Sequence, residues 1–273
     1  MLLRKLEIML KRIIKKIEQI VLEWISVFFP LSLLVVFLKL YGFKVKTIEK
    51  KNGIYRFEDT YGEVIWFTRI HRVLRYKNGV LFKLSDLQKE YLTDNLKFGK
   101  EDVIVDVGAN VGEYTMFWEK RGCKCISLEP DHTEFIALKK NVDKGTIFNM
   151  GAWHSQGELI FYHKNETADS SLIETSNFDY KSKIEVITLD LALDTVPVIS
   201  LLKLEAEGAE PEVIQGSKNV LLRTKYITVD VGEERGVNEE STLPDVVNSL
   251  IPLGFKVIDI NFSRGVLLLK STR

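Results

Sequence analysis

Residues 103–112 have the sequence VIVDVGANVG, and this stretch decides the fold. Its first half is a short, continuous apolar run, which is typical of a strand buried in a parallel sheet. Gly108 and Gly112 allow the backbone to approach a ligand closely where the strand turns into a helix. The helix predicted for residues 113–121 adds oriented N–H groups at the same place. The stretch therefore predicts the nucleotide site of a doubly wound α/β domain.

A carboxylate ends the next predicted strand, residues 123–128. Glu129 follows Gly108 by 21 residues, so it lies at the tip of the second strand, where it can accept hydrogen bonds from ribose hydroxyls. Asp106, at the tip of the first strand, can hold the amino-acid end of the same ligand. The two acids and the turn between them predict a binding site for a nucleoside that carries an amino acid.

The glycine spacing distinguishes between nucleotides. A dinucleotide fold requires GxGxxG, but Asn110 stands where the second of these glycines would be. Asp106 would also repel a pyrophosphate. S-adenosylmethionine has no phosphate and suits a close, polar turn. We therefore predict S-adenosylmethionine as cofactor, with an NAD-dependent oxidoreductase as the alternative and a turn of purely structural importance as a third interpretation.

The third strand is predicted to contain residues 147–150 and to continue into the loop 151–155, GAWHS. In this fold that loop flanks the adenine, so we assign Ala152 and Trp153 to the cofactor site. The Trp153 ring could cover the adenine, and His154 or Ser155 could contact its amino group; an ordinary core position for Trp153 fits the sequence equally well. Residues 158–162 are predicted to form the following strand.

An acidic motif, EAEGAE at 205–210, ends the fourth predicted strand, residues 199–204, and Pro211 opens a helix. Ligands of doubly wound folds bind beyond the carboxyl ends of the strands. If S-adenosylmethionine donates a methyl group, a general base can activate the molecule that accepts it. The general-base candidates are Glu205 and Glu207, with Lys203 or Glu233 orienting this acceptor. A divalent cation could activate the acceptor instead, since carboxylates suit Mg²⁺; the sequence leaves base and metal open and identifies no metal ligands.

Several blocks of this sequence resemble the FkbM family of methyltransferases. They are DVGANVG at 106–112 with Tyr114 and Thr115, Glu129-Pro130, TLD at 188–190, LKLEAEGAE at 202–210 and VIQG at 213–216. Glu205 stands where the family usually shows Asp. The resemblance covers roughly residues 84–270 and adds Tyr114 and Thr115 to the cofactor-binding residues.

The resemblance implies a Rossmann-like, seven-stranded methyltransferase sheet whose last strand pair is antiparallel, and methyl transfer to oxygen. The sequence supplies a fifth strand at 226–231 and a final pair at 255–260 and 265–270. The implied acceptor is a hydroxyl on a glycan, a glycolipid-like molecule or a small molecule. A non-catalytic, membrane-associated adaptor that has kept the fold is an alternative function.

Charge and cysteine content limit the other possibilities. The formal net charge is zero, from 38 Lys and Arg against 38 Asp and Glu, and there is no Asn/Asp-Pro-Pro-aromatic motif, which disfavours nucleic acid as substrate. Cys123 and Cys125 lie two residues apart on one predicted strand and cannot easily form a disulfide with each other. Reduced, buried thiols predict a cytoplasmic protein.

The N-terminal segment, residues 1–42, is predicted to be helical. Apolar residues recur from Leu2 to Phe28 in steps of three and four. The other face carries Lys5, Lys11, Arg12, Lys15 and Lys16. The uncharged run 24–38 would span roughly 22 Å as a helix, short of a bilayer core of about 30 Å, and contains Pro30. We predict that the segment either binds the inner face of the cell membrane or packs on the catalytic domain or a second subunit; the oligomeric state stays open.

Between this segment and the methyltransferase domain, residues 43–83 are predicted to form a small β-layer. Asn-Gly pairs at 52–53 and 78–79 each predict a hairpin between alternating runs. Ser85 starts a capping box, which predicts a helix over residues 86–96. The methyltransferase domain is accordingly predicted to cover residues 84–273.

Overall fold

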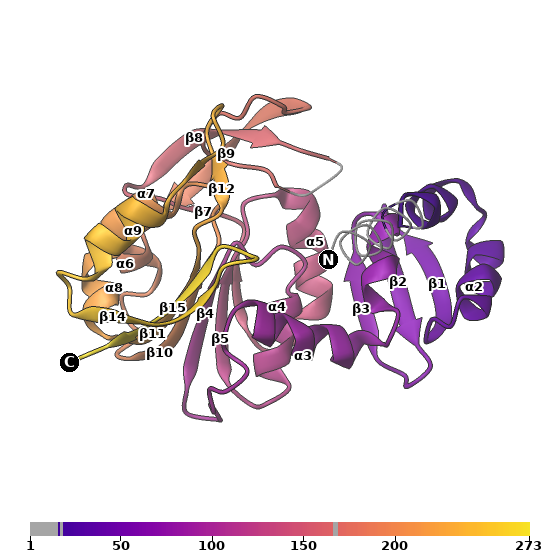
Figure 1. The fold of residues 1–273 in the computed structure, drawn as a ribbon, viewed down its shortest axis with the longest axis horizontal. Coiled ribbons are helices and arrows are strands. Elements are labelled where there is room, and N and C mark those ends of the chain that lie inside the picture. Colours follow the sequence, from indigo (N-terminus) through magenta and orange to yellow (C-terminus); the bar gives the residue numbers. More distant parts are fainter. Residues whose placement is uncertain (1–15, 17–18, 166–168) are drawn as a thin grey trace, which may run out of the picture. The chain divides into compact units, whose positions relative to one another are not determined.

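The computed structural model describes residue 16, residues 19–165 and residues 169–273 (Figure 1). The chain divides into two compact units between Lys83 and Leu84. Most of the apolar stripe predicted from Leu2 to Phe28 lies outside the described residues; residues 19–28 are helical. Within the described ranges, no helix combines the length and the apolar character needed to cross a membrane.

In the N-terminal unit a helix and a sheet share one core. The helix α2 (Leu31–Leu40) buries Leu34 and Leu38 and contacts β1 (Val45–Lys51). β1 pairs antiparallel with β2 (Ile54–Asp59), and β2 with β3 (Val64–Phe67). The hairpin predicted at Asn52-Gly53 is confirmed: both residues have positive φ, 50° and 84°, as a two-residue hairpin turn requires.

The second predicted hairpin is wrong. The 3₁₀ helix η1 (Ile70–Tyr76) precedes Gly79, and the helix α3 (Val80–Glu90) follows it. The buried carboxylate of Asp59 causes the difference, because its Oδ2 accepts from the backbone N–H of Val80 at 2.9 Å and begins the helix there. The helix predicted for residues 86–96 therefore starts and ends about six residues earlier. A cap supplied from a distant strand leaves no local sequence signal.

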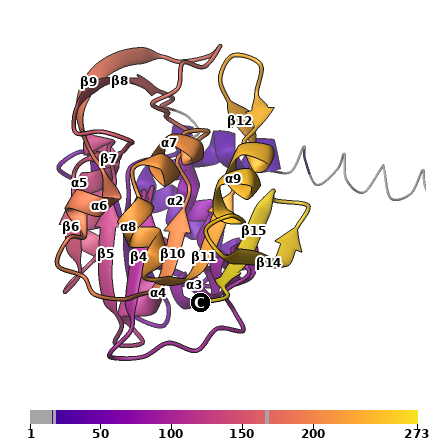
Figure 2. The same ribbon diagram turned by 90° about the vertical axis from the view of Figure 1, so that its left-hand side faces the viewer.

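The C-terminal unit is built on a seven-stranded sheet with the order β14-β15-β11-β10-β4-β5-β6 (Figure 2). Its strands in chain order are β4 (Val103–Val107), β5 (Lys124–Leu128), β6 (Thr146–Phe148), β10 (Ile199–Leu204), β11 (Thr224–Asp230), β14 (Phe255–Asn261) and β15 (Val266–Ser271). The first five are parallel, and β15 is antiparallel to both neighbours. This confirms the predicted Rossmann-like fold and its antiparallel final pair.

Helices cover both faces of this sheet. Figure 1 shows α4 (Glu113–Glu119) and α5 (His132–Asn141) on one face. The other face carries α6 (Leu189–Ala192), α7 (Glu210–Gln215), α8 (Lys218–Leu222) and α9 (Leu243–Leu250). The chain leaves β4 in one direction towards β5 and returns on its other side as β10. The strand order reverses here, so the carboxyl ends of β4 and β10 form the switch point where such folds bind ligands.

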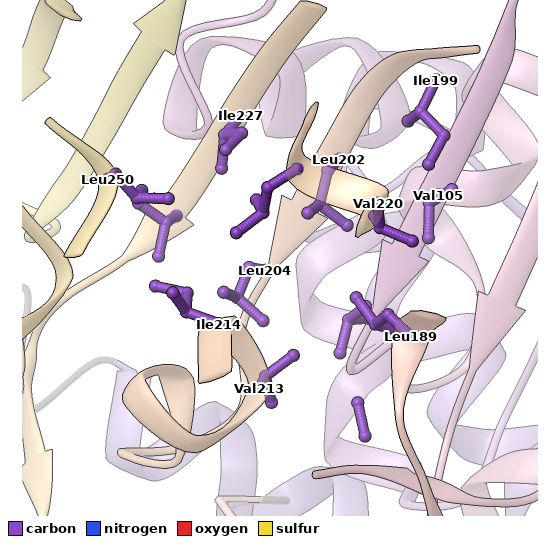
Figure 3. Close-up of a cluster of buried hydrophobic side chains, with 14 of the residues drawn as sticks. Val105, Leu189, Ile199, Leu202, Leu204, Val213, Ile214, Val220, Ile227 and Leu250 are labelled. Carbon is purple, nitrogen blue, oxygen red and sulfur yellow. The ribbon is translucent and has the colours of Figure 1, made fainter. Parts of the chain in front are cut away.

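A buried apolar cluster fixes β10 from one side. Figure 3 shows Leu202 and Leu204 of β10 among side chains from α7, α8 and α9, including Val213, Val220 and Leu250. Successive side chains of a strand point to opposite faces. Lys203, between the two leucines, therefore points to the other face of the sheet, where its register partner on β4 is Asp106.

A smaller sheet adjoins the C-terminal ends of these strands. It has the order β7-β9-β8, from β7 (Gly151–Ala152), β8 (Gly157–His163) and β9 (Tyr180–Ile187). The predicted strand at 158–162 is confirmed by β8. The predicted third strand is corrected: β6 ends at Phe148, and Gly151-Ala152 pairs with β9, a strand that sequence analysis missed.

Candidate active site

The turn after β4 has the backbone conformation that the glycine pattern predicted. Gly108, Asn110 and Gly112 all have positive φ, 72°, 52° and 88°. Asparagine tolerates this region better than most residues, so it can replace the second glycine of a dinucleotide turn. Glu129 closes the turn: its carboxylate accepts from the N–H of Asn110 at 2.6 Å and from the N–H of Asp131 at 2.8 Å. The fold thus brings the predicted turn and the predicted ribose acid together.

Gly108 also touches the acidic motif. A Cβ at this position would lie 1.9 Å from the backbone carbonyl oxygen of Glu205. The turn after β4 and the loop after β10 therefore pack backbone to backbone. Glycine is required at position 112 for a different reason: a Cβ there would lie 2.6 Å from a methyl group of Leu138 on α5.

Gly108→Ala is expected to destabilise the protein by about 2–5 kcal/mol, from roughly 1–2 kcal/mol for a left-handed alanine and roughly 1–3 kcal/mol for overpacking against Glu205. Gly122→Ala is the matched control, because Gly122 has φ +86° with nothing within 4 Å of its Cβ. Urea denaturation measures both. Equal losses in the two variants would show that the contact with Glu205 contributes nothing.

A charged cluster of Asp106, Lys203, Glu205, Asp230 and Arg264 lies beneath the turn. Asp106, Lys203 and Asp230 are buried, Glu205 is half-buried, and Arg264 is exposed. The ammonium nitrogen of Lys203 lies 2.9 Å from Asp106 and 3.0 Å from Glu205, and it donates to the carbonyl of Gly108 at 3.0 Å. Burial disfavours this ammonium ion, but the two carboxylates outweigh burial and raise the pKa of Lys203. Lys203 is therefore a permanent cation that joins β4 and β10.

Every oxygen of the Glu205 carboxylate has a partner. Tyr91 donates to it at 2.5 Å and Arg264 at 2.7 Å, in addition to Lys203. Burial alone would raise the pKa of Glu205, but Lys203, Arg264 and these hydrogen bonds lower it to about 2. Asp230, whose pKa burial and the charge of Glu205 raise to about 6, lies 3.4 Å from the Arg264 guanidinium. This geometry favours Glu205 as a fixed anion over Glu205 as a proton acceptor.

Tyr114 and Thr115 lie in the interior behind the turn. Thr115 donates to Asp106 at 2.7 Å and is itself fully buried. Tyr114 is buried, donates to Thr93 at 3.2 Å and packs its ring edge against Tyr91. Through these contacts, Thr115 holds Asp106 in place and Tyr114 holds Tyr91 in place.

The acidic loop itself is held in a strained conformation. Glu207 has φ +50°, which is uncommon for a residue with a side chain. The carboxylate of Glu210 accepts from the N–H groups of Ala206 at 2.8 Å and Gly208 at 3.3 Å, and Ser171 donates to the carbonyl of Glu207 at 2.6 Å. These bonds on either side of Glu207 fix where its side chain leaves the loop.

A short hairpin packs on the same loop. It pairs β12 (Glu233–Arg235) with β13 (Glu240–Ser241). Arg235 forms a bidentate ion pair with Glu212 at 2.9 and 2.6 Å and donates to the carbonyl of Gly208. A Cβ on Gly208 would lie 2.6 Å from the Cα of Arg235, so the two backbones are in contact.

Because of this contact, Glu234 lies near enough to Glu207 for its charge to affect the pKa of Glu207. Burial raises the pKa of Glu207 well above its ordinary value, and the charge of Glu234 is the next cause, followed by Glu205, Asp169 and Glu210. Burial and the charges of Asp230, Glu205 and Glu210 raise the pKa of Glu234 to about 8. Glu233, the residue predicted from the sequence, is exposed on the hairpin. Its neighbour Glu234 is half-buried, and it is the charge of Glu234 that acts on Glu207.

Sequence reasoning missed Tyr91, Asp230, Glu234 and Arg264. Asp230 had a usable signal, since it ends β11 as Asp106 lies near the end of β4 and Glu205 directly follows β10. Glu234 could have been found from the alternation of side chains along a strand. Tyr91 and Arg264 reach Glu205 across 114 and 59 residues of sequence, and no spacing rule connects them.

The loop after β6 lies against α7. Ala152 is buried in β7, and the backbone N–H of Trp153 donates to the carbonyl oxygen of Ile187 at 2.9 Å. The ring of Trp153 is partly buried, and its centroid lies 5.3 Å from that of His154. A Cβ on Gly216 would lie 2.2 Å from the carbonyl oxygen of Trp153, which fixes this loop against the end of the helix.

The described residues contain no group of three or more His, Cys, Asp or Glu side chains arranged to hold a metal ion. Cys123 and Cys125 are free thiols and buried. Burial raises the pKa of Cys123 to about 11, so this thiol is unreactive near neutral pH.

Comparison with known proteins assigns these features to a family. The family model described as "Methyltransferase FkbM domain" matches residues 106–257. Hexuronic acid methyltransferase AglP from Haloferax volcanii is 27% identical over 145 residues, which cover 48% of this chain and 56% of the relative. The chain thus matches little more than half the length of that protein.

Two further proteins are similar over more of their length. 2-O-methyltransferase NoeI from Sinorhizobium fredii is 23% identical over 228 residues, 74% of this chain and 93% of the relative. Among solved structures, magnesium protoporphyrin IX methyltransferase (ChlM) from Synechocystis PCC 6803 with bound SAM superposes with a TM-score of 0.42 at 10% identity, over 73% of this chain and 83% of the other.

Proposed function

Because this chain belongs to the FkbM family of methyltransferases, we propose that it transfers a methyl group from S-adenosylmethionine to a hydroxyl oxygen of a sugar-containing acceptor. One observation carries the proposal: the family match contains both the turn 108–112 and the acidic loop 205–210, which the fold brings into contact at one sheet edge. The names of the two curated relatives, a hexuronic acid methyltransferase and a 2-O-methyltransferase, support a sugar hydroxyl as acceptor.

The residues present fit S-adenosylmethionine. The turn through Gly108, Asn110 and Gly112 has positive φ angles, and its two glycines carry no side chain that would block a nucleoside. Glu129 presents buried carboxylate oxygens, which suit the two ribose hydroxyls. Beneath the turn the carboxylates of Asp106, Glu205 and Asp230 outnumber the two cations Lys203 and Arg264, and this net negative charge favours a sulfonium cation over the pyrophosphate of NAD. When bound, S-adenosylmethionine supplies an electrophilic methyl group.

Proton transfer from the acceptor hydroxyl is assigned to Glu207. Its raised pKa makes it a stronger base than an ordinary carboxylate, and efficiency is greatest when the pKa of the base lies near the operating pH. Glu234 tunes Glu207 through its charge. Lys203 and Arg264 hold Glu205 as a fixed anion that orients the acceptor. The chain's main contribution is alignment of the acceptor oxygen with the methyl group, a large proximity effect.

Cofactor identity is tested first by thermal shift of the full chain with S-adenosylhomocysteine and, separately, with NAD. At about 100 times its Kd a ligand stabilises the folded state by roughly 2.7 kcal/mol. We expect a shift with S-adenosylhomocysteine only. A shift with NAD only would favour the oxidoreductase. Transfer of a labelled methyl group to uronic acids and other glycans then tests the acceptor class.

Cofactor affinity is expected to rise with pH up to about pH 8. Burial and the charge of Glu134 raise the pKa of Glu129 to about 8, although two backbone N–H donors act to lower it. Only the ionised carboxylate accepts from both ribose hydroxyls, so below pH 8 the Kd should increase about tenfold per pH unit. Calorimetric titration with S-adenosylhomocysteine between pH 6 and 9 measures this. Glu129→Gln should bind weakly with a flat profile; an unchanged slope would exclude Glu129 as its source.

A further inference from the structure

Two helical segments of the N-terminal unit present apolar faces to solvent. On residues 19–28 the exposed large apolar side chains are Ile20, Val21, Trp24, Val27 and Phe28. On α2 they are Leu33, Val36 and Leu40. Each set follows the steps of three and four that place side chains on one face of a helix. We propose that these two faces bind the surface of a membrane that contains anionic lipids, with the helices lying in the interface.

The exposed apolar face of α2 is distinct from the face that packs in the core of its unit. Leu34 and Leu38 are fully buried and pack towards β1, whereas Leu33 is 56% and Leu40 83% exposed. The helix is therefore apolar on both sides, although only one side contributes to the core of its unit. Clusters of exposed apolar side chains of this kind mark interaction surfaces.

Aromatic side chains strengthen the assignment to a lipid interface. Trp24 and Phe28 are 61% and 65% exposed, and their ring centroids lie 4.7 Å apart. Tryptophan is enriched at the boundary between lipid chains and headgroups, because its ring is apolar and its N–H is polar. An exposed tryptophan paired with a phenylalanine is the anchor that an interfacial helix uses.

The charges near these faces match anionic headgroups. Residues 24–38 contain no charged residue, and basic residues stand on both sides of that run, Lys16 before it and Lys39 and Lys44 after it. The first 50 residues have ten Lys and Arg against four Asp and Glu, whereas the remaining chain has 28 against 34. Each basic residue near an anionic surface adds attraction. Two copies joined through these faces would instead bring like charges together, which disfavours a second copy as the occupant.

The test is flotation of the full chain with vesicles of phosphatidylcholine containing phosphatidylglycerol, and with vesicles of phosphatidylcholine alone. We expect binding to the anionic vesicles, at least tenfold weaker binding to the neutral ones, and loss of anionic binding in 0.5 M salt to a similar degree. Failure of the full chain to float with anionic vesicles would overturn the proposal.

A matched pair of variants assigns the binding to these faces. Leu33→Glu combined with Phe28→Glu should lower binding at least tenfold, whereas Leu222→Glu should not, although Leu222 is also 56% exposed. Thermal denaturation of both variants checks that they fold. Equal binding by the two would overturn the assignment. If size-exclusion chromatography shows a dimer that only the Phe28 and Leu33 substitutions dissociate, without flotation, a second copy covers the faces and the proposal fails.

Discussion

Replacement of Lys203 by methionine is expected to destabilise the protein by about 3–5 kcal/mol at pH 7, because it leaves the buried Asp106 without its cation and Glu205 with Arg264 alone. Lys203 is 2% exposed and lies 2.9 Å from Asp106 and 3.0 Å from Glu205. Methionine fills similar volume, so the loss reports charge rather than a cavity. Urea denaturation measures it, and Lys225→Met, an exposed lysine on the adjacent strand, should change stability by less than about 0.5 kcal/mol.

The pH dependence identifies the cause. In the wild-type protein the pKa of Glu205 is lowered to about 2 from 4.5, so its stabilisation is present above pH 4.5 and is lost as the pH falls towards 2. In Lys203→Met the Glu205 carboxylate keeps Arg264 but loses the ammonium group, so it takes up a proton at higher pH than in the wild type. The stability difference between the two proteins should therefore shrink as the pH falls from 7 to 4. A difference that stays constant would show that packing, not charge, caused the loss.

Glu207→Gln is expected to lower kcat by about 10²–10⁴-fold, the usual contribution of a general base, with little change in the Kd for S-adenosylhomocysteine. The pH profile distinguishes the two glutamates that the sequence proposed. If Glu207 is the base, its raised pKa gives wild-type kcat an acid limb well above pH 4.5. If Glu205 were the base, a pKa of about 2 would leave kcat flat from pH 5 to 8.

Two adjacent glutamates provide the control for that assignment. Glu234 raises the pKa of Glu207 through its charge, so Glu234→Gln should move the acid limb of kcat to lower pH. Glu233→Gln, one residue away on the exposed side of the same hairpin, should leave both the limb and kcat unchanged. An equal shift in both variants would show that the charge of Glu234 has no specific effect on Glu207.

The sequence predicted the parts of this site that are local. β4 is an apolar run with Asp106 one residue before its end, and the mostly apolar β10 leads directly into Glu205; fold topology alone brings their carboxyl ends together. Tertiary packing determined what the sequence could not. Asp59 caps a helix from a distant strand, and Arg264 reaches Glu205 from the last hairpin. The roles of Glu205 and Glu207 depended on such partners, because burial and neighbouring charges, not residue type, set their pKa values.

The contact between Gly108 and Glu205 has a thermodynamic consequence for the order of ligand binding. The backbone of the turn 108–112 cannot move towards the acidic loop without displacing that loop. The Lys203 ammonium also bonds to Gly108 in the turn and to Glu205 in the loop. A ligand that orders the turn therefore also orders the loop. Linkage then requires reciprocity: if the cofactor increases the affinity for the acceptor by some factor, the acceptor increases the affinity for the cofactor by the same factor. The two substrates of this methyltransferase should bind cooperatively, through a contact that neither of them makes.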